Sequence, residues 1–238
     1  MSSEIPTGEN DFAEVALRVL KDQSQEAVAE YIKATQSLLR DRPTNPVDAV
    51  FFFGRSWGDA KKEELFRLAV DYIKTDMARY IIIPGTEGET YGGNIPQVAN
   101  PGMTLWTSRL VGMGVPSDRI IPSDKGYNTK AEGDAFLVKC KEEGWTSGVA
   151  IANEHQILRA TLGLCKTIND EDLQFNIYSD ASRTNNWHGL VRGSQGAELK
   201  PRSAHILDEF MRVQKYQEKG DLASYEKLYS YLERRGSN

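Results

Sequence analysis

His155 is the side chain of this sequence best suited to transfer a proton. It opens a segment with helical periodicity directly after the apolar run 148–152, and Arg159 lies one helical turn further on the same face. A histidine in this place could act as a general acid or base or donate to a phosphate oxygen, while Arg159 could fix an anionic group. A surface histidine near a helix start shows the same pattern, so the spacing alone leaves both interpretations open.

Polar turns follow four apolar runs of the chain, and three of these turns are rich in glycine. Glycine lets the backbone approach a ligand closely, and a helix that follows such a turn offers free N–H groups to an anion. Ligands of parallel-sheet proteins bind beyond the carboxyl ends of the strands, so we expect these turns to form one site. The expected ligand-binding residues, besides Arg159, are Gly54, Arg55, Ser56, Gly85, Thr86, Glu87, Asn128, Thr129 and Asn153.

Helix capping is the competing interpretation of two of these turns. Ser56 and Asp59 have the S-x-x-D spacing of a helix cap, and Thr129 with Glu132 has the T-x-x-E spacing of a capping box. The glycines match neither the GxGxxG dinucleotide fingerprint nor the GxxxxGK[ST] phosphate loop. No histidine, cysteine and carboxylate set has zinc-ligand spacing, so we expect no metal site and leave the cofactor unknown. His205, in a C-terminal helix, is expected to be structural.

Apolar runs that alternate with amphipathic segments predict an α/β fold. We expect a Rossmann-like three-layer sandwich, with a mostly parallel sheet of about five strands and extra N- and C-terminal helices. The expected strands are 47–53, 79–84, 119–122, 148–152 and 173–178. The expected helices are 11–40 with a break near 22–25, 60–75, 103–113, 129–143, 154–167, 202–219 and 221–235. A core domain at 47–180 would carry the segments 1–46 and 181–238 as parts of the same unit.

The composition excludes several classes of protein. The 238 residues carry a net charge of −5 and no basic run longer than a pair, which argues against a dedicated nucleic-acid binder. No apolar run approaches the roughly 20 residues that span a membrane, and residues 1–11 lack a signal-peptide pattern. Cys140 and Cys165 show no CxxC spacing, so we expect buried, reduced thiols in helices. These features predict a soluble cytoplasmic protein that could form homo-oligomers through its terminal helices.

Three motifs resemble those of the YdcF/SanA/ElyC-like proteins, a family of unknown function. The run LVGMGVPSDRII at 110–121 is similar to the family's "L…GVP…I", NTKAE at 128–132 to its "NTxE", and HQILRA at 155–160 to its "HxxxRA". The resemblance spans about residues 47–180, and Gly133 stands where the family commonly has asparagine. It implies a Rossmann-like fold and a pocket at the strand ends, and it gives functional roles to Glu132 and His155.

Three hypotheses for function follow. The first is an enzyme, a hydrolase or transferase, that acts on a phosphorylated or nucleotide-like small molecule, with His155 as acid/base and Glu132 orienting it. The second is a non-catalytic protein that binds or senses a nucleotide or S-adenosylmethionine. The third is an interaction protein that associates through its terminal helices. NAD-dependent oxidoreduction is not expected, because the glycine fingerprint is missing.

Overall fold

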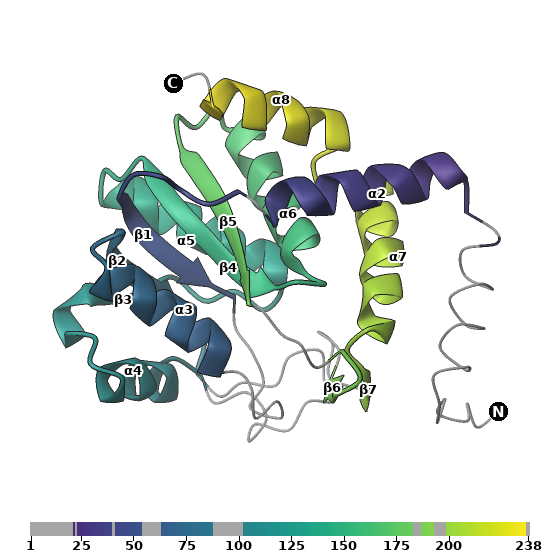
Figure 1. The fold of residues 1–238 in the computed structure, drawn as a ribbon. Helices are drawn as coiled ribbons and strands as arrows, with labels where there is room; N and C mark the ends of the chain where they lie inside the picture. The colour runs from purple at the N-terminus through teal and green to yellow at the C-terminus, as the bar shows by residue number, and fades with distance from the viewer. Residues whose placement is uncertain are drawn as a thin grey trace.

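A five-stranded, all-parallel sheet forms the centre of the computed structural model (Figure 1). The structure describes residues 21, 23–39, 41–53, 63–87, 102–182, 187–192 and 199–236. The strand order is β3-β2-β1-β4-β5, which is the order of a Rossmann-like sheet and confirms the expected fold class. The strands are β1 (Val47–Phe52), β2 (Ala78–Ile83), β3 (Ile120–Pro122), β4 (Ser147–Asn153) and β5 (Asn176–Ser182).

The central strand β1 is buried on both faces, which explains its continuous apolar sequence. Phe51 points to one face and stacks on Phe136, with ring centroids 4.8 Å apart. Its neighbour Phe52 points to the other face and meets Phe66 edge-on at 4.9 Å. Because side chains alternate along a strand, this one short segment contributes aromatic packing to two separate cores.

Helices cover both faces of the sheet and complete the three layers (Figure 1). One core lies between the sheet and five helices, and the other lies beneath two helices. The five are α2 (Gln25–Leu38), α5 (Thr129–Glu142), α6 (Ile157–Asp170), α7 (Ala204–Glu218) and α8 (Tyr225–Gly236). The two are α3 (Glu63–Lys74) and α4 (Gly102–Gly112), and a 3-10 turn, η3 (Ser117–Arg119), leads into β3. The terminal helices α2, α7 and α8 therefore share the core of the sheet.

The segment after α6 differs from the sequence-based expectation. The helix continues to Asp170 and is followed by Asp172 in the left-handed region, with φ 49°. This turn delays the strand, so β5 occupies 176–182 and not 173–178. Two further strands, β6 (Leu190–Arg192) and β7 (Leu199–Pro201), pair antiparallel between the last expected strand and the expected helix 202–219, where we expected no secondary structure. Each has three residues, too few for a strand pattern to be visible in the sequence.

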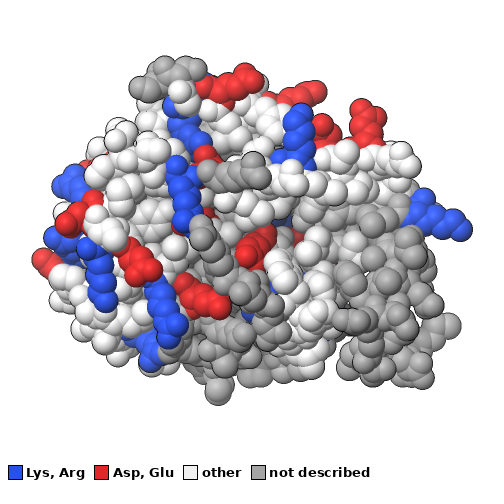
Figure 2. Space-filling model, viewed as in Figure 1, with Lys and Arg blue, Asp and Glu red and all other residues white. Residues whose placement is uncertain are grey.

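Charged side chains of both signs are interspersed over the face of the molecule shown in Figure 2. No contiguous field of one sign covers the described part of this face, in keeping with the absence of a long basic run in the sequence. Among the described helices, none is both long enough and apolar enough to cross a bilayer.

Both thiols are expected to resist modification in the folded protein. Cys140 in α5 and Cys165 in α6 are free and fully buried, as the sequence indicated. Burial raises the pKa of both thiols, that of Cys165 to about 12, so neither forms a reactive thiolate near neutral pH. We expect Ellman's reagent to label neither cysteine in native buffer and both in denaturant. Labelling of either thiol at native-state rates would contradict this placement.

Candidate functional site

The strand order reverses between β1 and β4, and their carboxyl ends mark the candidate site. Strands β2 and β3 lie on one side of β1 in the sheet, and β4 pairs with the other side of β1. The helices that follow β1 and β4 diverge at such a reversal, which is where open parallel sheets bind ligands. Gly54, Arg55 and Ser56 follow β1 in the sequence, and these three residues lie outside the part of the chain that the structure describes.

The turn after β4 leads directly into α6. We expected this helix to begin at 154, but a turn intervenes, in which the Gln156 amide donates to the Asn153 carbonyl at 2.9 Å. The side chain of the N-cap residue, Gln156, makes no capping hydrogen bond to α6. Gln156 itself is 2% exposed, and its side-chain oxygen accepts no hydrogen bond from any described residue. The first N–H groups of α6 present a partial positive charge at the carboxyl edge of the sheet.

His155 lies half-buried in this turn and stacks on a second histidine. The ring centroids of His155 and His205 are 5.6 Å apart, with 28° between the ring planes. His205 is 1% exposed and comes from the first turn of α7. The sequence analysis treated His205 as structural and did not predict that it lies beside His155.

Arg159, expected to bind a ligand, lies in a buried ion pair. Its Nε donates to Glu209 at 2.5 Å and its Nη2 at 3.3 Å, and Arg212 donates to the same carboxylate at 2.8 Å. Burial would raise the pKa of Glu209, but Arg159 and Arg212 outweigh it and hold this pKa below its usual value. The charge of Arg159 is thus balanced within the fold, which makes it a weaker anion holder than expected. Its role in ligand binding stays a prediction.

The turn after β2 holds the start of α4. The carbonyl of buried Thr86 accepts from the Met103 amide at 2.8 Å. Glu87 accepts from the amide of Thr104 at 3.1 Å and from its hydroxyl at 2.5 Å. Two predicted ligand-binding residues therefore have a capping role, and their contact with a ligand stays a prediction.

Gly85 is expected to be intolerant of a side chain. A Cβ atom there would lie 2.0 Å from the Ser123 carbonyl oxygen, because the turns after β2 and β3 pack backbone to backbone. Gly85→Ala should lower the free energy of unfolding by about 1–3 kcal/mol, the usual cost of overpacking. Gly112→Ala is the control, since a Cβ atom at Gly112 would meet nothing within 4 Å. Urea denaturation compares the two variants, and equal stability would contradict the close approach.

The start of α5 follows the turn after β3. Asn128, not Thr129, caps this helix: its side-chain oxygen accepts from the Ala131 amide at 2.9 Å. The predicted capping box is therefore wrong, because Asn128 keeps the extended backbone of a cap and Thr129 is already helical. Thr129 is half-buried, and Glu132 is 4% exposed in the first turn of the helix.

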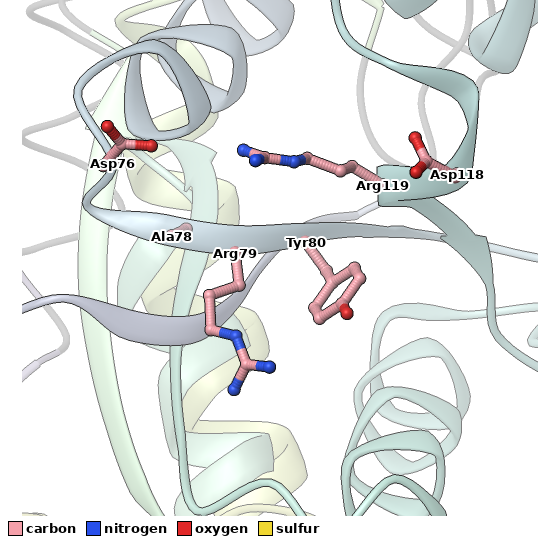
Figure 3. A pocket seen from close by; sticks show the side chains of 6 residues that line it. All are labelled: Asp76, Ala78, Arg79, Tyr80, Asp118 and Arg119. Carbon is pink, nitrogen blue, oxygen red and sulfur yellow. The ribbon is translucent and has the colours of Figure 1, made fainter.

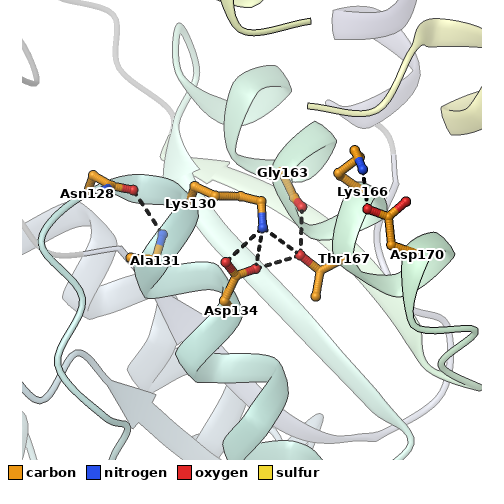
Figure 4. Close-up of polar contacts among 8 residues, drawn as sticks. All are labelled: Asn128, Lys130, Ala131, Asp134, Gly163, Lys166, Thr167 and Asp170. Atoms are coloured by element: carbon orange, nitrogen blue, oxygen red, sulfur yellow. Dashed lines mark hydrogen bonds and ion pairs between the residues drawn. The ribbon is translucent and has the colours of Figure 1, made fainter. Parts of the chain in front are cut away.

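A polar contact fixes α5 against α6 (Figure 4). The Lys130 ammonium lies 2.7 Å from both carboxylate oxygens of Asp134 and 2.8 Å from the Thr167 hydroxyl. A Cβ atom at Gly133, beside Glu132, would lie 3.1 Å from Leu164 of α6 and 3.7 Å from Phe53 at the end of β1. Glu132 therefore lies at the end of β1, on the same edge of the sheet as His155.

A separate pocket lies at the opposite, amino edge of the sheet (Figure 3). Its cations are matched by carboxylates, and Arg79 pairs with Asp48 at 3.4 Å and lies over the ring of Tyr80. The sequence analysis did not mark this place. The pocket is lined by Asp76, Ala78, Arg79, Tyr80, Asp118 and Arg119.

Comparison with known proteins gave no match to a family model or a curated protein, so the fold alone defines the class of this protein. The molecule is an α/β protein with a Rossmann-like parallel sheet, and its candidate site lies at the carboxyl edge. The resemblance to the YdcF/SanA/ElyC-like proteins stays a prediction. In the described part of the chain, no three histidine, cysteine or carboxylate side chains are grouped to hold a metal ion.

Proposed function

We propose that this protein is a hydrolase or transferase that acts on a phosphorylated or nucleotide-like small molecule at the carboxyl ends of β1 and β4. The observation that supports this most is the turn after β4, where His155 precedes the N-terminus of α6 and the N-cap residue Gln156 makes no side-chain capping hydrogen bond. The N-terminus of a helix at a strand-order reversal is a suitable place for an anionic group.

In this proposal the backbone binds the anion and His155 moves the proton. The N–H groups of α6 hold the phosphate oxygens, and His155 takes a proton from the attacking water or hydroxyl. The attacking oxygen bonds to phosphorus while the bond from phosphorus to the leaving oxygen breaks, and His155 returns the proton to the departing oxygen. Glu132, in the first turn of α5, orients His155. Because Arg159 is paired with Glu209, it contributes less to anion binding than its sequence position suggested.

Binding without turnover is the second candidate function. The ion pair of Arg159 favours it, because a balanced cation contributes less to stabilising the charge that develops in phosphoryl transfer. The ligand in this case would be a nucleotide or S-adenosylmethionine, held at the same turn. The proposal has three further parts. The protein belongs to the YdcF/SanA/ElyC-like family, lies in the cytoplasm and forms homo-oligomers through its terminal helices.

A thermal-shift screen tests the proposal on the whole chain. The panel contains nucleotides, sugar phosphates and S-adenosylmethionine, and the proteins are the wild type, His155→Ala and the control Lys166→Ala at the far end of α6. A ligand at 100 times its dissociation constant should add about 2.7 kcal/mol to stability. We expect a phosphorylated compound to stabilise the wild type and the control and to be converted by both.

The outcomes separate the two candidate functions. Conversion that is lost in His155→Ala while stabilisation remains supports the enzyme. Stabilisation of the wild type with no product from any compound supports the binding protein. A panel in which no compound stabilises the wild type would contradict both.

A further inference from the structure

Two matched contacts join the start of α6 to the start of α7. His155 and Arg159 are four residues apart, as are His205 and Glu209. His155 meets His205 at 5.6 Å between ring centroids, and Arg159 meets Glu209 at 2.5 Å. His205 and Glu209 lie on one face of α7, and they meet in turn a residue just before α6 and a residue in its first turn.

His205 is held in place from several sides. Its Nδ1 lies 3.3 Å from a carboxylate oxygen of Asp208, and that oxygen also accepts from the Lys200 ammonium at 2.7 Å. Lys200 belongs to β7, so the carboxylate connects the histidine to the small antiparallel sheet. The amide of Ser203 donates to the Trp187 carbonyl at 3.0 Å and fixes the backbone where α7 begins.

We propose that His205 is a positioning residue for His155, with its buried ring serving as the platform that sets the ring plane of His155. The inference rests on the proposed function, in which His155 transfers a proton. A half-buried imidazole in a turn has two ring torsions to restrain, and a flat, immobile neighbour at stacking distance restrains both. A catalytic group that is displaced by about 1 Å can lose on the order of 100-fold in rate.

The charges around the histidine pair come from all the elements packed against it. Arg159 belongs to α6, Asp208 and Glu209 belong to α7, and Lys200 belongs to β7. Arg212 also bonds to Glu209, and Glu154 is the chain neighbour of His155, so groups of both signs lie near the rings. The platform role is consequently carried by the shape of the His205 ring more than by a net local charge.

Two substitutions separate a platform from a residue that only fills space. His205→Leu fills the buried site with an apolar side chain of similar size but removes the flat ring. His205→Phe keeps a flat ring but cannot bond to Asp208, which retains its contact with Lys200. Val213→Ala is the control, because it weakens the packing of the same face of α7 two turns away from the pair.

NMR spectroscopy of protein with isotope-labelled histidines measures the environment of the His155 ring directly. We expect the resonances and the titration midpoint of His155 to change in His205→Leu and to stay unchanged in Val213→Ala. With the substrate from the screen, kcat should fall on the order of 100-fold in His205→Leu with little change in KM. His205→Phe should retain most of the activity. Melting curves confirm that each variant is folded.

The results distinguish this inference from the proposed function. Turnover that requires His155 but is equal in the wild type and His205→Leu overturns the platform alone. A His155 titration that is identical in these two proteins overturns it as well, with or without a known substrate. Equal losses in the Leu and Phe variants also contradict a platform. Turnover that survives in His155→Ala contradicts the proposed function, and the NMR comparison still decides whether His205 sets the His155 ring.

Discussion

Replacement of Glu209 by methionine is expected to lower the free energy of unfolding by about 3–5 kcal/mol, the usual cost of breaking a buried ion pair. The side chains of Arg159 and Glu209 are only 9% and 2% exposed. Loss of the carboxylate leaves the guanidinium of Arg159 in the interior without its counter-charge. Urea denaturation measures the change.

The hydrogen-bond partners of Glu209 predict which variants of this ion pair lose more stability than others. Arg159→Met should cost less than Glu209→Met, because Arg212 still donates to the carboxylate at 2.8 Å. The double replacement by methionine at both positions should recover much of the loss, since it leaves neither charge buried. If the double variant were as unstable as Glu209→Met, packing and not the charge would explain the loss.

The pH dependence of stability gives a second measurement of the same pair. The pKa of Glu209 is lower in the folded protein than its ordinary value of 4.5, because Arg159 and Arg212 outweigh the cost of burial. A lowered folded pKa stabilises the fold above pH 4.5, and this stabilisation is lost as pH falls through the folded pKa. The difference in stability between the wild type and Glu209→Gln should therefore shrink on acidification. A constant difference would contradict the assignment.

Removal of the His155 imidazole is expected to lower turnover by roughly 100-fold to 10,000-fold, the range for general acid–base groups. Binding should change much less, because the proposal assigns the anion to the N–H groups of α6 and not to the ring. The measurement is kcat and the dissociation constant of the same phosphorylated substrate for the wild type and His155→Ala.

Two further variants control for structural damage at His155. His155→Gln keeps a polar side chain in the turn but cannot exchange a proton near neutral pH, so it should be as inactive as the alanine variant. Lys166→Ala, at the other end of α6, should retain wild-type turnover. Comparable turnover in His155→Gln and the wild type would show that the ring does not transfer a proton.

The sheet could be predicted from the sequence because its signals are local. The run VDAVFFF is apolar on both faces and ends at a glycine, and the structure has β1 at Val47–Phe52. The start of β5 was placed too early. The residue in the left-handed turn before it is Asp172 and not glycine, so the sequence carried no clear signal for this turn. The antiparallel pair β6–β7 was missed because strands of three residues show no periodicity.

The candidate site was only partly predictable, because part of it is built by contacts between distant segments. The position of His155 after a strand was visible in the sequence. Its neighbour His205 lies 50 residues further on, in a helix whose pattern gave no indication of where it packs. The repeat of a four-residue spacing, His155 to Arg159 and His205 to Glu209, was the available signal. Pairing the two spacings required the packing of α7 on α6.

NMR mapping of a bound nucleoside monophosphate tests the central claim most directly, because it locates the ligand on the sheet without requiring turnover. The account predicts that the amides of Ile157 and Leu158, at the start of α6, shift most on titration. The amides of Arg79 and Tyr80, at the opposite edge beside the other pocket, should stay unchanged. Shifts confined to Arg79 and Tyr80, or no shifts in the first turn of α6 at saturating ligand, would contradict a site at the carboxyl ends of β1 and β4.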